Sequence, residues 1–176
     1  RKAAMKITWF GGTTLRVHLG GQVLVVDAEG AGARVERAEL VSGADRVVGF
    51  ADQPEVNGVG WRPRKVGRVL DEGASAPVES WSVGAGALLI EGDGERPLLV
   101  VAGDVPVVGR WASEAVVVLL GAELAERGLA VLEGAGPRLM ALGGNDAVLE
   151  EAFAALSGRL DGTGLVALER GMALEV

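Results

Sequence analysis

The chain contains no cysteine and a single histidine among its 176 residues. Disulfide bonds, thiolate nucleophiles and cysteine-ligated metals are therefore impossible. No serine lies in a G-x-S-x-G context, and one histidine is too few to support a serine–histidine–aspartate triad. The histidine, His18, lies inside the alternating stretch TLRVHL, where it is either a structural strand residue or an isolated ligand or base.

Apolar runs of membrane-spanning length are also missing, and the longest, around EAVVVLLGAEL, is bounded by Glu114 and Glu123. The opening RKAAMKITWF has basic residues but no apolar segment after them, so we expect no signal peptide. The net charge of −7 disfavours nucleic-acid binding, because it repels phosphate backbones at long range. These features predict a cytoplasmic protein that does not bind membranes. The preference for Ala, Gly, Val and Arg over Lys and Ile is typical of a GC-rich bacterial genome.

Apolar residues make up 49% of the chain, which is enough for the core of one domain spanning residues 1–176. The 28 glycines have no three-residue period and separate short elements, as in strands joined by tight turns. Alternating and β-branched segments predict strands at residues 5–10, 14–19, 22–28, 45–50, 65–70 and 77–83, a hairpin over 86–104, and strands at 114–120, 137–144 and twice within 163–176.

Helical periodicity is concentrated in the last third of the chain. It predicts helices over residues 122–134 and 146–160, the second capped by Asn145, and one or two helical turns over 35–40. Strands come first and then alternate with helices, an order that predicts layered sheets covered by helices.

The order of these elements resembles the metallo-β-lactamase-fold hydrolases, especially the small UlaG-like metal-dependent hydrolases. MKITWFGGTTLRVHLGGQVLVVDA is similar to the family's opening, and Gly11, Thr14, Gly20, Gly21 and Asp27 fit its pattern. RVVGFADQPEVNG lines up with the family's AD-x-V-L-x-T-H-x-H-x-D-H-x-x-G segment, LLVVAGD with the strand carrying its late bridging aspartate, and GLVALERGMALEV with its terminal strand pair. The resemblance implies a single four-layer αββα sandwich.

The metal ligands that the resemblance implies are nearly all missing. Asp104 alone survives in kind. The other family ligand positions fall on Gly12, Ala51, Gln53, Glu55, Val56 and Gly143. A dinuclear site of this type needs several imidazoles and a bridging carboxylate, and glycine, alanine and valine side chains offer no lone pair. We therefore expect a catalytically silent relative, a pseudoenzyme without a cofactor, that serves as a binding, structural or regulatory subunit.

Two alternatives stay open at this point. Glu55 and Asp104 could hold one weakly bound divalent cation with waters, with His18 as a further candidate, which would leave a residual metal-dependent hydrolase. Asp104 is equally compatible with a simple turn residue after a strand. The segment WRPRKVGR gathers Arg62, Arg64, Lys65 and Arg68 beside Trp61, and it is either a solvated loop or a binder of phosphate, an acidic partner or single-stranded nucleic acid.

Three tryptophans are expected near the former metal cleft, because Trp61, Trp81 and Trp111 each follow or lie in a segment that lines up with the family's site. We predict that at least two of them line or cap the cleft, either as a binding platform or as plugs of the vacated space. The partner would be an unidentified protein or a small ligand, and a homo-oligomer is left open.

Overall fold

The computed structural model describes residues 5–64 and 77–176. Its first sheet consists of β1 (Lys6–Trp9), β2 (Leu15–Leu19), β3 (Gln22–Val26), β4 (Arg46–Val48) and β11 (Ala173–Glu175). The strand order is β11-β1-β2-β3-β4, antiparallel except between β3 and β4. The turn at Gly20-Gly21 joins β2 to β3, as the sequence predicts.

The second sheet is larger and mostly parallel in its central part. It consists of β5 (Glu79–Gly84), β6 (Ala87–Glu91), β7 (Leu98–Val101), β8 (Val116–Leu120), β9 (Leu139–Gly143) and β10 (Gly164–Ala167). The order is β10-β9-β8-β7-β6-β5, with β7 to β10 parallel and β5 and β6 antiparallel to their neighbours. The strands β6, β7 and β8 are buried along their whole length, because both faces of this sheet are covered.

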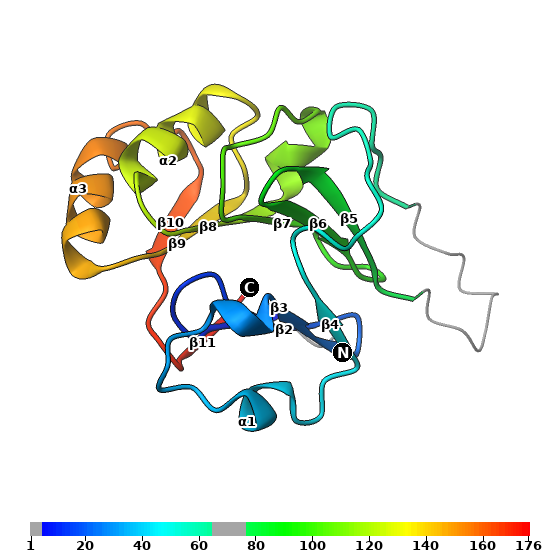
Figure 1. Cartoon of the computed structure of the whole chain (residues 1–176). Coiled ribbons are helices and arrows are strands. Elements are labelled where there is room, and N and C mark those ends of the chain that lie inside the picture. Colours follow the sequence, from blue (N-terminus) through cyan, green and yellow to red (C-terminus); the bar gives the residue numbers. More distant parts are fainter. Residues whose placement is uncertain (1–4, 65–76) are drawn as a thin grey trace.

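Helices cover the outer faces of both sheets (Figure 1). They are α1 (Arg37–Val41), α2 (Leu124–Glu133) and α3 (Asp146–Leu156), with the 3₁₀ turns η1 (Ala28–Gly30) and η2 (Arg110–Glu114). Leu40 of α1 packs with Val25 on the first sheet, whereas α2 and α3 pack on the second. The predicted αββα arrangement is therefore confirmed. Asn145 caps α3, since its side chain accepts a hydrogen bond of 2.9 Å from the Val148 amide.

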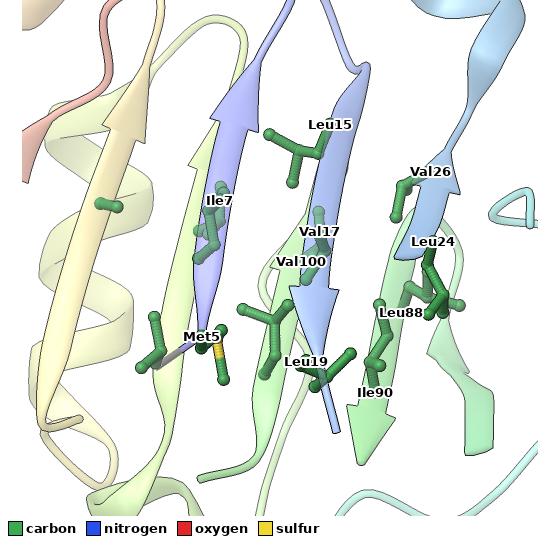
Figure 2. Packing of buried hydrophobic residues seen from close by; sticks show 14 of the residues in the cluster. Met5, Ile7, Leu15, Val17, Leu19, Leu24, Val26, Leu88, Ile90 and Val100 are labelled. Carbon is green, nitrogen blue, oxygen red and sulfur yellow. The ribbon is translucent and has the colours of Figure 1, made fainter. Parts of the chain in front are cut away.

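The main core lies between the two sheets (Figure 2). Alternation in β1 and β2 points Ile7, Leu15 and Val17 inward, and these residues are fully buried. They meet Leu88 of β6 and Val100 of β7 in one continuous apolar cluster. In the second sheet, the residues between those that face the inter-sheet core point outward, and they build a second core under the helices.

The last two predicted strands and the strand predicted at residues 65–70 have different outcomes. The last two strands are present, but β10 joins the second sheet and β11 the first, so the chain crosses between the sheets at residues 168–172. The strand expected at 65–70 lies outside the described residues. None of the described helices is long and apolar enough to cross a bilayer.

Candidate functional site

One edge of the sandwich collects the segments that follow its parallel strands. In the first sheet β1, β3 and β4 run in the same direction, and in the second sheet β5 runs with β7, β8 and β9. Two contacts join the two sets of strand ends, one between Trp9 and Gly143 and one between Glu55 and Ser82. The family's ligand positions in this sequence all follow or end these strands, so they gather along this edge.

The segment after β4 forms an open hollow of about 610 Å³ with the β5–β6 hairpin. Its walls are Phe50, Ala51, Gln53, Glu55 and Val56 on one side and residues 82–86 on the other. Glu55 is exposed and lies beside Ser82 of β5, where the amide of Val56 donates to the Ser82 carbonyl at 2.9 Å. The loop is thus attached to the sheet through its backbone, and the Glu55 carboxylate is left to solvent.

Gln53 is part of a polar network that links the two sheets. The Ser80 hydroxyl on β5 donates to Oε1 of Gln53 at 2.5 Å, and Nη2 of Arg46 on β4 donates to the same hydroxyl oxygen at 2.9 Å. The Gln53 amide in turn donates to Asp52 at 2.8 Å. This bond and the Gly49 amide hold the pKa of the Asp52 carboxyl below its usual value. The Gln53 side chain, at a position where the sequence resemblance implies a histidine, therefore serves as a structural connection.

Asp104 is exposed and lines a neighbouring hollow of about 440 Å³. This hollow shares Val56 and residues 83–85 with the first one, so Asp104 and the 51–56 loop do lie near each other. Within residues 5–64 and 77–176, however, no three acidic or histidine side chains are grouped as a metal would require. His18 is exposed on β2, opposite Lys6 and Val23, and lines neither hollow.

Arg127 of α2 interacts electrostatically with Asp104, and its role is not apparent from the sequence. Its guanidinium donates to four backbone carbonyls, all at 2.8–2.9 Å, those of Val101, Gly103, Leu120 and Ala122. Burial lowers the pKa of Arg127, and the charges of Asp104 and Glu123 oppose that shift. The guanidinium thus satisfies carbonyls where β7 and β8 end.

The turn that holds Gly12 is packed too closely for any side chain. Gly12 has a φ of 53°, and a Cβ atom at this position would overlap the carbonyl oxygen of Gly30 in η1. The same corner is fixed by Asp27, whose carboxylate accepts from the Thr13 hydroxyl and whose carbonyl accepts from the Thr14 hydroxyl at 2.5 Å. A histidine cannot occupy position 12 in this backbone.

Trp9 occupies the space next to Gly143. A Cβ on Gly143 would lie 2.7 Å from Leu120 Cδ2 and 3.1 Å from Trp9 Cε2. The indole is only 5% exposed and donates to the Gly12 carbonyl at 3.1 Å. The guanidinium carbon of Arg170 lies 5.6 Å from the centre of the ring. One side chain therefore lies between Gly12 and Gly143, two positions where the sequence resemblance implies histidines.

The three tryptophans singled out in the sequence lie elsewhere. Trp61 packs against Trp81 and Trp111 with ring centres 5.8 Å and 4.9 Å apart, in the core under the helix-covered face of the second sheet. Trp61 and Trp111 are 7% and 6% exposed, and Trp81 is half-buried. None of the three lines either edge hollow. Of the two alternatives, the exposed platform does not fit Trp61 and Trp111, because both indoles are buried in the outer core.

The predicted basic patch is only partly available. Arg64 forms a 2.8 Å ion pair with Glu91, a buried carboxylate that also accepts from the Arg64 amide. Arg62 is exposed and donates to the Val59 and Trp61 carbonyls. Lys65 and Arg68 lie outside the described residues. Base stacking on Trp61 is excluded by its burial, and the charge of Arg64 is neutralised locally.

Two packed sheets with helices on their outer faces are the arrangement of the metallo-β-lactamase fold. A protein from Thermotoga maritima, assigned to the Zn-dependent hydrolases of the metallo-β-lactamase superfamily, superposes with a TM-score of 0.55 at 12% identity, covering 94% of this chain and 99% of that one. Igni18, a metallo hydrolase from Ignicoccus hospitalis, gives 0.53 at 12% identity, covering 99% of both chains. YhfI of Bacillus subtilis, a metallo-β-lactamase fold protein, gives 0.55 at 14% identity, covering 99% and 100%.

No protein-family model and no curated protein matches this sequence. At such low identity the three structures establish the shared fold, while the chemistry must be judged from this chain's own residues. The donor set does not fit the metals of that fold, because Gly12, Ala51, Val56 and Gly143 have no donor and Gln53 is engaged by Ser80 and Arg46.

Proposed function

We propose that this chain is a catalytically silent member of the metallo-β-lactamase fold that works by binding, as a structural or regulatory subunit. In this proposal, the edge where the sequence resemblance implies metal ligands serves as a binding surface. The proposal rests on one observation, the crowding of position 12 by the Gly30 carbonyl and of position 143 by the side chains of Leu120 and Trp9.

This crowding supports catalytic silence more strongly than the absence of ligand residues from the sequence does. A ligand that is merely substituted leaves space that a neighbouring side chain or a water could fill. Here a Cβ at Gly12 would overlap the backbone carbonyl of Gly30 in η1, and a Cβ at Gly143 would be crowded by the side chains of Leu120 and Trp9. A histidine at either position would therefore require its neighbours to shift. Glu55 and Asp104, both exposed, provide two carboxylates on adjacent hollows, too few to hold and polarise a catalytic ion strongly.

Polar contacts of two arginine side chains fix this edge. The Arg46–Ser80–Gln53 network joins β4 to β5, and Arg127 holds the ends of β7 and β8. With the edge fixed in this way, the hollow beside Glu55 is the surface we assign to the partner. Its exposed acidic side chain suits a basic group on a protein or small ligand.

The metal content of the purified protein tests the first claim of the proposal, that the chain is catalytically silent. Protein purified without chelator should contain well under one equivalent of zinc, manganese or iron by mass spectrometry. Zinc at about 100 μM should leave the free energy of unfolding unchanged, whereas a gain of about 2.7 kcal/mol would mean a dissociation constant near 1 μM. Tight stoichiometric metal that is lost in the Glu55→Gln/Asp104→Asn variant would overturn the proposal in favour of a residual hydrolase.

The binding half is tested by charge reversal in the hollow. Glu55→Lys should abolish recovery of a partner that wild-type protein retains from its host extract. Glu151→Lys is the matched control, because Glu151 is an exposed glutamate on α3, far along the chain from the hollow. Equal recovery by all three proteins would contradict the assignment of this surface.

A further inference from the structure

A partly enclosed pocket of about 290 Å³ lies on the helix-covered face of the second sheet. Leu99 of β7 and Val117 of β8 form its floor, and Ala130, Val131 and Gly134 at the end of α2 form one wall. The opposite wall is the 105–108 loop that follows Asp104. Its buried lining residues belong to the outer core under the helices and not to the core between the two sheets.

The lining of this pocket is uniform in chemistry. All eleven residues that line it are Leu, Val, Ala, Pro or Gly, so no side chain presents a charge or a hydrogen-bonding group. No aromatic ring lines it either, although the tryptophan cluster belongs to the same outer core. Such walls cannot orient a polar ligand or stack an aromatic one, and they favour an aliphatic group.

The pocket is too large to be an ordinary packing defect. Interiors are close-packed, and large unfilled cavities cost stability in proportion to their volume. Space is left here because the helix wall has only Ala130 and Gly134 where longer residues would reach across. A Cβ on Gly134 would meet only the carbonyls of its own helix, at 3.5 Å or more. At the rim Val107 is 80% exposed, which extends the apolar lining to the surface.

We propose that this pocket binds a medium-chain aliphatic group, such as the tail of an acyl or alkyl compound, with its polar head in solvent. An apolar cavity of about 150 Å³ accommodates benzene, so this pocket corresponds to a tail of roughly ten carbon atoms. The site is separate from the sandwich edge, and it stands or falls independently of the metal question.

The probe is 1-octanol, which has an uncharged head. Titration into the wild-type protein, followed by the methyl resonances of Val and Leu, should show saturable binding of one molecule. The shifts should be concentrated at Leu99, Val117 and Val131 and absent from the inter-sheet core. Shifts concentrated in that core, or no saturation up to the solubility of octanol, would overturn the proposal.

A filling variant tests the location. Ala130→Leu extends a methyl-lined wall into the pocket and should raise the dissociation constant at least tenfold. Ala154→Leu is the matched control, since Ala154 is also an exposed helical alanine but lies on α3 and does not line the pocket. Unchanged affinity in Ala130→Leu, or an equal loss in both variants, would contradict the site. Should Ala130→Leu fail to fold, the wild-type shift map alone decides.

Discussion

Removing the Trp9 indole tests how much of the stability of the fold depends on filling the corner between Gly12 and Gly143. Trp9 is 5% exposed, contacts the backbone at Gly143, and donates to the Gly12 carbonyl at 3.1 Å. In Trp9→Ala all of these contacts are lost at once. The neighbouring Gly12 and Gly143 have no side chains that could move into the space.

The expected magnitude follows from area and hydrogen bonding. A buried tryptophan removes about 200 Å² from water, which at about 25 cal/mol per Å² corresponds to about 5 kcal/mol as an upper limit. The hydrogen bond to Gly12 adds about 1 kcal/mol. Partial relaxation reduces the sum, so we expect Trp9→Ala to cost about 4 kcal/mol, within the usual range for aromatic core truncation. Trp9→Phe keeps most of the apolar area and should cost about 1–2 kcal/mol.

Urea unfolding followed by circular dichroism measures these differences from the midpoint and slope. Trp81→Ala is the comparison, because Trp81 is half-buried and packs on Trp61 in the outer core. Its cost should be clearly smaller than that of Trp9→Ala. A loss below about 1 kcal/mol for Trp9→Ala would show that the corner does not need the indole, and the reasoning about crowding would fail with it.

Three further changes test other parts of the edge. Arg127→Met should destabilise the fold by about 2–4 kcal/mol in urea unfolding, because four carbonyls lose a charged donor that methionine cannot replace. Gly12→Ala should cost at least about 2 kcal/mol more than Gly21→Ala, since both have positive φ but only Gly12 faces a backbone oxygen at overlapping distance. The lowered pKa of Asp52 means that its carboxylate stabilises the fold above the unfolded value of 3.8 and loses this effect as pH falls through the lower folded value. The stability difference between wild type and Asp52→Asn should therefore be constant above about pH 5 and shrink below pH 3.8, as read from urea unfolding at each pH.

Most of the strands were predictable, because alternation and β-branched runs follow directly from burial of one or both faces. The contacts made by side chains at the edge of the sandwich were harder to predict. Trp9 lies at the end of the MKITWF strand, on the same face as Ile7, so its inward direction was readable. The sequence did not reveal that the indole ring lies beside Gly143, because the two positions are 134 residues apart.

Arg127 illustrates the same limit from the helix side. It lies four residues before Val131 on α2, so its position on the buried face could have been predicted from helical spacing. A charged residue such as Arg127 in AELAERGLAVLEG is expected to be solvent-exposed when its hydrogen-bond partners are unknown. Those partners are carbonyl groups, which every residue has, and no sequence pattern marks which of them will be left unpaired.

The close approach of Gly12 to Gly30 makes it difficult to introduce a histidine at position 12 by a single mutation. A laboratory selection for hydrolysis that begins from this gene would meet a steric barrier at position 12 before any ligand was gained, since η1 would first have to shift. Loop positions such as Ala51 and Glu55 are exposed and free to change, but they cannot complete the set alone. Selection from this starting point should therefore favour new chemistry on the open side of the edge over recovery of the old.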